Sequence, residues 1–256
     1  MIPDIAQLSG WAFTFTLVLG RCAAAISVLP GFGESASPAV LRAGIALGMA
    51  ILLTPGIAPL VPPVPEASLV AISMILAETA TGLWLGWLAR LFALALPTAA
   101  QFIAYLLGLS SVLQPDPELG PQTAALSRLF GVAAPLVLLT SGLFMLPLSA
   151  LAGSYRVITP GGLLPAADGV QEAVAAVSLS FALALRLAAP FVVAGVVWNA
   201  CIGLVARLVP RLQVYFAAMP AQIVGGFALL AFLVGAVLQA WETALQDRWM
   251  NLPGIG

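Results

Sequence analysis

The segment 185–220 constrains the fold of this chain more than any other. It is almost wholly apolar, but Gly195, Asn199, Gly203 and Arg207 recur in it at every fourth position. On an α-helix this spacing places small and polar side chains in one slowly drifting stripe, while the rest of the helix surface is aliphatic and aromatic. Such a helix is buried or lies in lipid, and its polar stripe needs a partner.

The amino-acid composition places the chain in or at a membrane. Hydrophobic residues make up 62% of the chain and charged residues only 7%, whereas soluble domains carry about 25% charged residues. A polar surface cannot be built from so few charges, so we expect an integral membrane protein or a subunit buried in a membrane-associated assembly. The formal net charge of −1 leaves no basic surface for nucleic acid.

The sequence predicts no catalytic, metal or cofactor site. His is absent, which excludes imidazole chemistry and histidine ligands, and no HExxH motif, serine elbow or facing pair of carboxylates is visible. Cys22 and Cys201 lie inside apolar runs, where we expect small core residues, with a disulfide left open. The N-terminus carries Asp4 and no cationic segment, so the first apolar run is expected to be a retained helix rather than a cleaved signal peptide.

Long apolar runs predict helices, because about 20 apolar residues are needed to cross a bilayer. Prolines within or between the runs predict bends or ends, above all at positions 97, 135, 147, 190 and 220. We predict an all-α, membrane-associated bundle of about six or seven long, kinked helices that form hairpins, in a single domain 1–256. The expected helices cover residues 11–29, 40–60, 69–96, 98–109, 123–151, 170–210 and 214–241, and the short tail after them is weakly amphipathic.

Two loops are expected between these helices. The segment 153–171 is the longest polar stretch and is expected to lie outside the apolar layer. The segment of about 108–122 is rich in Pro and Gly, and it fits either an ordinary exposed loop or a loop at the mouth of a channel. Its candidate residues are Gly108, Leu109, Ser110, Ser111, Val112, Leu113, Gln114, Pro115, Asp116, Pro117, Gly120 and Pro121.

Two sets of residues are candidates for helix seams or assembly contacts. In the first, Glu78, Gly82, Gly86 and Arg90 repeat every fourth position, so the glycines would let a neighbouring backbone approach closely; the alternative is coincidence in a helix rich in Ala and Gly. The second set would contact either other subunits or partners in the same chain. It comprises Arg186, Pro190, Gly195, Asn199, Gly203, Arg207, Pro210, Arg211 and Gln213.

Five pieces of the sequence, in this order, resemble the FliR family, the R subunit of the flagellar export gate, and its injectisome counterpart SctT. They are Arg21 with LPGFGESASPAVLR (29–42), the Glu78–Gly82–Gly86 helix, the loop with Asp116-Pro117, SYRVITPGG (154–162), and 185–220 with PRLQVYFAAMP at its end. The last piece is the most specific, since polar residues at fixed places in an apolar run are hard to obtain by chance. The chain departs from the family pattern at Ser141-Gly142, where Asn-Gly is frequent, and at Arg211 and Tyr215.

The resemblance implies a structural role rather than an enzymatic one. Family members join P-type and Q-type subunits in a helical assembly around a narrow channel, with a B-type subunit at its entrance. Unfolded protein substrates pass through this gate in the bacterial inner membrane, within the flagellar basal body, driven by energy that other components supply. The loop after the middle helices acts as a plug in the closed pore, and here that loop is about 108–122.

The sequence leaves three alternative functions open. An injectisome gate would share every motif above. A secondary transporter would explain broken helices and intramembrane charges, but two equal halves are not visible and acidic residues within helices are scarce. An intramembrane enzyme lacks any signature. The arginines are spread over both sets of loops, so they do not determine the orientation in the membrane.

Overall fold

The computed structural model describes residues 5–34, 37–108, 125–162, 166–208 and 214–255. In these ranges the chain is helical and contains no strand, which confirms the all-α prediction. The helices are α1 (Ile5–Val28), α2 (Ala39–Ile57), η1 (Ala58–Leu60), α3 (Ser68–Ala93), α4 (Ala95–Leu106), α6 (Ala125–Ser141), α7 (Met145–Val157), α8 (Ala166–Leu208) and α9 (Val214–Trp249).

If each of two near-continuous helix pairs is counted as one, the described residues contain six long helices, in agreement with the prediction of six or seven. Only Leu94 separates α3 from α4, and α6 and α7 form one element bent by 73°. The bend follows Ser141, where Gly142 adopts a φ of 76° that only glycine takes without strain.

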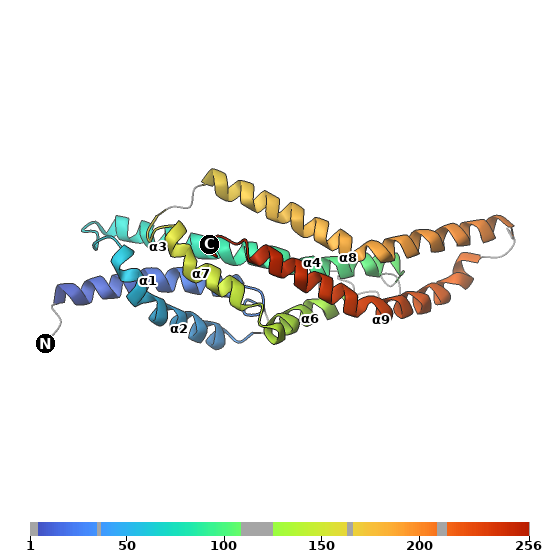
Figure 1. The fold of residues 1–256 in the computed structure, drawn as a ribbon, viewed down its shortest axis with the longest axis horizontal. Helices are drawn as coiled ribbons and strands as arrows, with labels where there is room; N and C mark the ends of the chain where they lie inside the picture. Colours follow the sequence, from blue (N-terminus) through green and yellow to red (C-terminus); the bar gives the residue numbers. More distant parts are fainter. Residues whose placement is uncertain (1–4, 35–36, 109–124, 163–165, 209–213, 256) are drawn as a thin grey trace. The chain divides into compact units, whose positions relative to one another are not determined.

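The prolines differ in part from their predicted roles. Pro97 and Pro147 do not break helices but are the third residues of α4 and α7, where a missing backbone N–H leaves no helical bond unmade. The breaks near these two prolines therefore fall slightly earlier than predicted. Pro135, Pro190 and Pro220 lie inside α6, α8 and α9 respectively, and Figure 1 shows α8 and α9 bending part-way along their length.

Among the described residues, five helical segments are long and apolar enough to cross a membrane, or six if the bent pair α6 and α7 counts as one span. The five are Leu8–Val28, Ala39–Leu60, Ser68–Leu106, Gly169–Leu208 and Ala218–Trp249. Their outer surfaces carry large apolar side chains, and those more than 60% exposed include Val40, Leu69, Leu204 and Phe232. These surfaces suit a lipid or protein environment rather than water.

The chain divides into two compact units. Unit 1 comprises residues 1–93, 135–177 and 246–256, and unit 2 comprises residues 94–134 and 178–245. A single functional domain over 1–256 stays a prediction.

Unit 1 is organised around the packing of α1 on α3. Leu17, Cys22 and Ala25 of α1 are fully buried, and α2 and α7 add to the same core through contacts with α1 and α3 respectively. The backbones approach closely because Gly82 and Gly86 have no side chain. A Cβ on Gly86 would lie 2.6 Å from the carbonyl oxygen of Ala25, and one on Gly82 would meet the carbonyl oxygen of Arg21.

The C-terminal residues belong to this core, which the sequence analysis did not anticipate. Helix α9 continues to Trp249, beyond the predicted end at residue 241. Trp249 is fully buried and donates its indole Nε1–H to the carbonyl oxygen of Ala89 over 3.3 Å. Gly254 packs against the backbone of Gly153, so the tail closes unit 1.

The predicted polar loop 153–171 is shorter than expected. Helix α7 includes Gly153 to Val157, and α8 begins at Ala166. Ser154 and Tyr155 are buried because the Ser154 hydroxyl and the Tyr155 ring contact Arg21 inside unit 1. The polarity of this segment did not predict its exposure, since the polar groups of Ser154 and Tyr155 have partners inside the protein.

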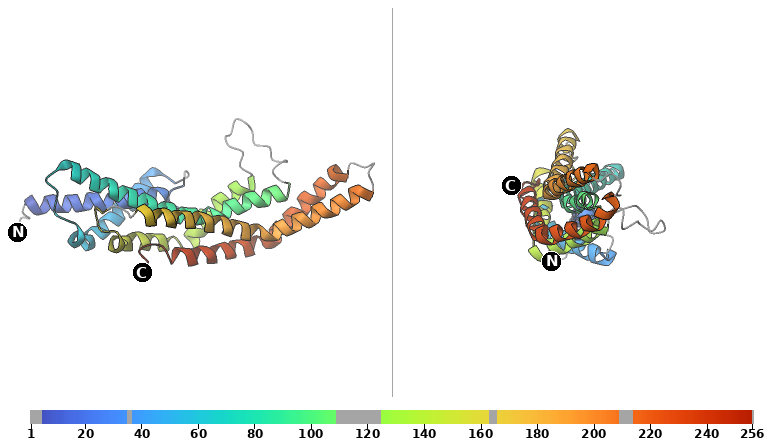
Figure 2. Two further views of the ribbon diagram at one scale, coloured as in Figure 1. Left: turned by 90° about the horizontal axis from the view of Figure 1, so that it is seen from above. Right: turned by 90° about the vertical axis from the view of Figure 1, so that its right-hand side faces the viewer.

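Unit 2 contains α4, the first part of α6, and the parts of α8 and α9 between residues 178 and 245. Ser127 Oγ–H donates to the carbonyl oxygen of Pro97 over 2.9 Å, joining α6 to α4. Within this unit α8 and α9 lie side by side and run antiparallel (Figures 1 and 2). This pair is a helical hairpin of the kind expected from the sequence, and residues 209–213 between its arms lie outside the described ranges.

Candidate functional site

An arginine and a glutamate pair inside unit 1, out of contact with solvent. Arg21 of α1 donates Nε–H to Glu78 Oε2 over 2.7 Å and Nη2–H to Glu78 Oε1 over 2.8 Å. Both side chains are fully buried. The pair is bidentate, the geometry in which an arginine and a carboxylate interact most strongly.

The segment 154–161 completes this network. Arg21 Nη1–H donates to Ser154 Oγ over 3.0 Å and Nη2–H to the carbonyl oxygen of Ile158 over 3.2 Å. The guanidinium carbon lies 4.0 Å from the ring centre of Tyr155, a cation–π arrangement. The backbone N–H of Gly161 donates to Glu78 Oε1 over 2.7 Å. The pair therefore holds the end of α7 and its following turn against α1 and α3.

The geometry of this network fits a structural role rather than a catalytic one. Transfer of a charged group out of water costs several kcal/mol unless partners compensate, and here nearly every polar atom of the pair has one. A reacting group would need a polar atom left free for a substrate and a path by which the substrate reaches it. Among the described residues, no three His, Cys, Asp or Glu side chains lie close enough to hold a metal ion.

A second ion pair lies at the other end of the α1–α3 seam. Arg90 Nη2 lies 3.4 Å from Glu34 Oε2, and the two side chains are 27% and 32% exposed. Arg90 also donates to the carbonyl oxygens of Val28 and Gly33. All four residues of the predicted stripe therefore face α1 or the turn that follows it: Glu78, Gly82, Gly86 and Arg90. A role for these residues in assembly stays a prediction.

The polar stripe of α8 is arranged differently. Gly195 is buried, and a methyl group added there would lie in ordinary contact with Leu106. Asn199 is exposed and donates Nδ2–H to the carbonyl oxygen of Gly195, one turn earlier in its own helix. A methyl group added to Gly203 would have nothing within 4 Å, and Arg207 is exposed. The stripe leaves the interior of the chain as it approaches the end of α8.

The remaining predicted residues fall into two groups. Arg186 and Pro190 are described and exposed on α8. Gly108 is also described; with a φ of 71° it terminates α4, as glycine commonly does after a helix. Outside the described residues lie Leu109, Ser110, Ser111, Val112, Leu113, Gln114, Pro115, Asp116, Pro117, Gly120, Pro121, Pro210, Arg211 and Gln213.

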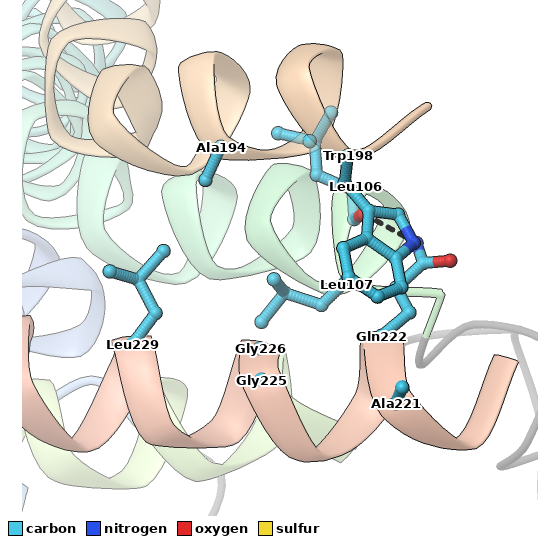
Figure 3. A pocket seen from close by; sticks show the side chains of 10 residues that line it. Leu106, Leu107, Ala194, Trp198, Ala221, Gln222, Gly225, Gly226 and Leu229 are labelled. Carbon is cyan, nitrogen blue, oxygen red and sulfur yellow. Dashed lines mark hydrogen bonds between the residues drawn. The ribbon is translucent and has the colours of Figure 1, made fainter. Parts of the chain in front are cut away.

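A cavity of about 290 Å³ lies between α4, α8 and α9 in unit 2. Its lining is almost entirely apolar, and Figure 3 shows Leu107 and Leu229 at its wall with Gln222 near one end. Gln222 Nε2–H donates to the carbonyl oxygen of Leu106 over 3.1 Å. The lining has no group suited to acid–base or nucleophilic chemistry, so we interpret the cavity as a packing gap between small residues of a helix bundle.

Sequence reasoning missed the network partners of Arg21. Arg21 and Glu78 each lie within an apolar run, and a lone charge in such a run costs about 2.5–3.5 kcal/mol on insertion scales. That cost indicates that two opposite charges within apolar runs form an ion pair. Ser154 and Tyr155 carried no comparable signal, because Ser and Tyr are also frequent in exposed loops.

The fold and this site define a class: an α-helical protein with several membrane-crossing segments, held together by a buried ion pair. Comparison with known proteins then gives the family. Residues 12–247 match the model of the bacterial export proteins, family 1, and the chain belongs to this family.

Individual relatives match along nearly the whole chain. The flagellar biosynthetic protein FliR of Caulobacter vibrioides is 30% identical over 95% of each chain, and FliR of Escherichia coli is 27% identical over 97% of this chain and 95% of its own. The Yop proteins translocation protein T of Yersinia pestis is 28% identical over 86% of this chain and 84% of its own. The resemblance seen in the sequence motifs is thereby confirmed.

Proposed function

We propose that this chain is a structural subunit of a type III protein export gate of the flagellar kind. Together with P-type and Q-type subunits, and with a B-type subunit at the entrance, it would form the channel that passes unfolded substrates across the bacterial inner membrane in the flagellar basal body. The observation that carries this proposal is the family match over residues 12–247. The relatives named FliR, which cover about 95% of both chains, favour the flagellar system.

The exposed apolar surface supports an assembled rather than a solitary protein. In the most apolar windows of the α2 and α9 spans, only 22% and 17% of the residues are buried within the chain. Helices with so little of their surface packed internally need lipid or neighbouring helices to cover the rest. A gate built from several subunits provides such neighbours along the whole length of each helix.

The proposed plug is the segment of about 108–122, which lies outside the described residues except for Gly108. Its support is compositional: Pro and Gly resist pairing into a stable helix or strand, so a plug of this kind could leave its site at low cost. Deletion of residues 109–122 is expected to raise small-ion leakage through the assembled gate, measured as dye or current leakage in cells. Unchanged leakage in a correctly assembled deletion variant would remove the plug from the proposal.

The gate function is tested by deletion of the gene and by co-purification. We expect the deletion to abolish swimming and the release of flagellin into the medium, and a tagged full-length copy to restore both and to bring down small multi-copy P-type and Q-type partners. Loss of effector secretion with unaffected swimming in the deletion strain would instead identify an injectisome gate, as the similarity to the Yop translocation protein allows. Uptake of a labelled metabolite by the purified chain alone in vesicles would identify a transporter.

A further inference from the structure

We propose that Arg186 binds a carboxylate on a helix of a neighbouring protein subunit, and that the exposed face of α8 around Arg186 is the docking surface for that helix. This inference rests on the proposed export-gate function and names the chemistry of one contact within it. It is carried by the charges of unit 2 and by the length and exposure of α8.

Arg186 lies in the middle of an exposed, apolar helix face. Several exposed apolar residues lie within about 60° of it around the helix axis, at 100° per residue. They include Ala182, Ala189, Val193, Val197 and Leu204, and the three larger ones of these are 64%, 56% and 63% exposed. One face of α8 therefore combines a wide apolar strip with Arg186 in its middle and Arg207 at its edge, near the end of the helix.

Small residues flank Arg186. Ala182 and Ala189 stand one turn before and one turn after Arg186, so a second helix can approach the backbone of α8 closely at this level. The long arginine side chain then reaches a carboxylate on the approaching helix without opening a gap. Small residues at this level favour contact with a neighbouring helix, because only a packed helix benefits from close approach to the backbone.

Unit 2 has few carboxylates for this arginine. Its described residues include three arginines, Arg128, Arg186 and Arg207, but only one acid, Glu242. The ion pairs found among the described residues both lie in unit 1, where they join Arg21 to Glu78 and Arg90 to Glu34. The described part of the chain thus compensates its buried cation internally and pairs Arg186 with no acid, and Asp116 and Glu118 of unit 2 lie outside the described residues. We assign the anion for Arg186 to a neighbouring subunit.

A protein carboxylate fits better than a lipid phosphate. Arg186 lies about 26 Å from Gly169 and about 33 Å from Leu208 at 1.5 Å per residue, near the middle of an apolar segment twice as long as the ~30 Å hydrocarbon core of a bilayer. With Arg186 at a headgroup, exposed apolar residues of its own face on one side of it, either Ala182 or Val193, would be left outside the hydrocarbon. A neighbouring helix covers both sides and carries the anion.

The test uses the tagged full-length chain in cells that make the whole gate. Arg186→Glu is expected to lower the recovery of P-type or Q-type partners roughly tenfold or more, because an interfacial charge pair becomes a repulsion. Arg128→Glu is the matched control, because Arg128 is also exposed and in unit 2 but lies in the first turn of α6 rather than in the middle of a long apolar helix; it should leave recovery near the wild-type level. Equal recovery with Arg186→Glu and the wild type would overturn the inference.

A second measurement identifies the anion and remains informative if Arg186→Glu fails to fold. A photo-cross-linking amino acid at Ala189, in a chain that keeps Arg186, should form a covalent adduct with a subunit helix that contains Asp or Glu. Exchange of that acid for Arg should then restore assembly to Arg186→Glu. Adducts with phospholipid alone, or with a helix that has no acid within one turn, would overturn the inference.

The two proposals fail in distinguishable ways. If no P-type or Q-type subunit accompanies the wild-type chain and the gene deletion leaves secretion intact, the export-gate function itself is wrong. If the wild-type complex forms and secretes but the charge exchange has no effect, only the role of Arg186 is wrong.

Discussion

Arg21 of α1 and Glu78 of α3 form a bidentate ion pair with N–H···O distances of 2.7 and 2.8 Å, and neither side chain has any exposure to solvent. Fifty-seven residues separate them in the chain, yet they join two long apolar helices and fix the turn after α7 against both. The pair sits directly beside Gly82, where the two backbones approach closely. The ion pair and the close approach at Gly82 therefore both fix the same alignment of α1 along α3.

Glu78→Gln is expected to destabilise the chain by about 3–5 kcal/mol, because it leaves a buried guanidinium without its counter-charge. The measurement is the thermal midpoint of the detergent-solubilised full-length chain, followed by tryptophan fluorescence. The control Glu34→Gln removes the partly exposed partner of Arg90 and should cost less than about 1 kcal/mol. The double variant Arg21→Met/Glu78→Leu should recover part of the loss; similar midpoints for both single variants would contradict the structural role of the buried pair.

Gly82→Ala is expected to destabilise unit 1 by about 1–3 kcal/mol, since the added methyl group meets the carbonyl oxygen of Arg21 and α1 must move away from α3. The matched control is Gly44→Ala in α2, where nothing lies within 4 Å of the new methyl group and the higher helix propensity of Ala should give no loss. Protease resistance of the two purified variants distinguishes them. Equal resistance would mean that the α1–α3 contact is looser than the structure has it.

Trp249→Ala is expected to cost about 3–5 kcal/mol, the usual range for removal of a large buried aromatic side chain, because Trp249 is fully buried and bonds Ala89. Trp249→Phe keeps most of the packing and should lose only about 1 kcal/mol with the hydrogen bond. Met250→Ala, next in the chain and 45% exposed, serves as the control. The yield of monodisperse protein after size exclusion ranks the three variants, and an unaffected Trp249→Ala would exclude the C-terminus from the core.

Asn199→Leu is expected to weaken recovery of the multi-subunit complex while leaving the chain itself folded. Asn199 is exposed, and its side chain bonds Gly195 in its own helix, so its loss removes no contact between helices. Asn251→Leu is a matched control, because Asn251 is also exposed and makes the same bond four residues back, to Asp247. Co-purification is the readout, and normal assembly and secretion with Asn199→Leu would assign Asn199 a local role.

Much of the fold could be predicted from the pattern of residues. Apolar runs and prolines located the long helices, because helix formation in an apolar setting depends mainly on local composition. Helix ends were less accurate: α9 extends to Trp249 and α7 includes Ser154 and Tyr155. In each case tertiary contacts, to Ala89 and to Arg21 respectively, stabilise a turn that the sequence alone presents as ordinary tail or loop.

The sequence by itself determined the class of this protein, since too few charges for an aqueous surface and apolar segments of membrane length leave only a helical, membrane-associated architecture. The tertiary structure alone decided which charges are compensated within the chain. Glu78 meets Arg21, and Arg90 meets Glu34, whereas Arg186 stays on an exposed apolar face. The reason is physical: the cost of an unpaired charge is set by its surroundings in space, and residues 57 positions apart become neighbours only when the helices pack.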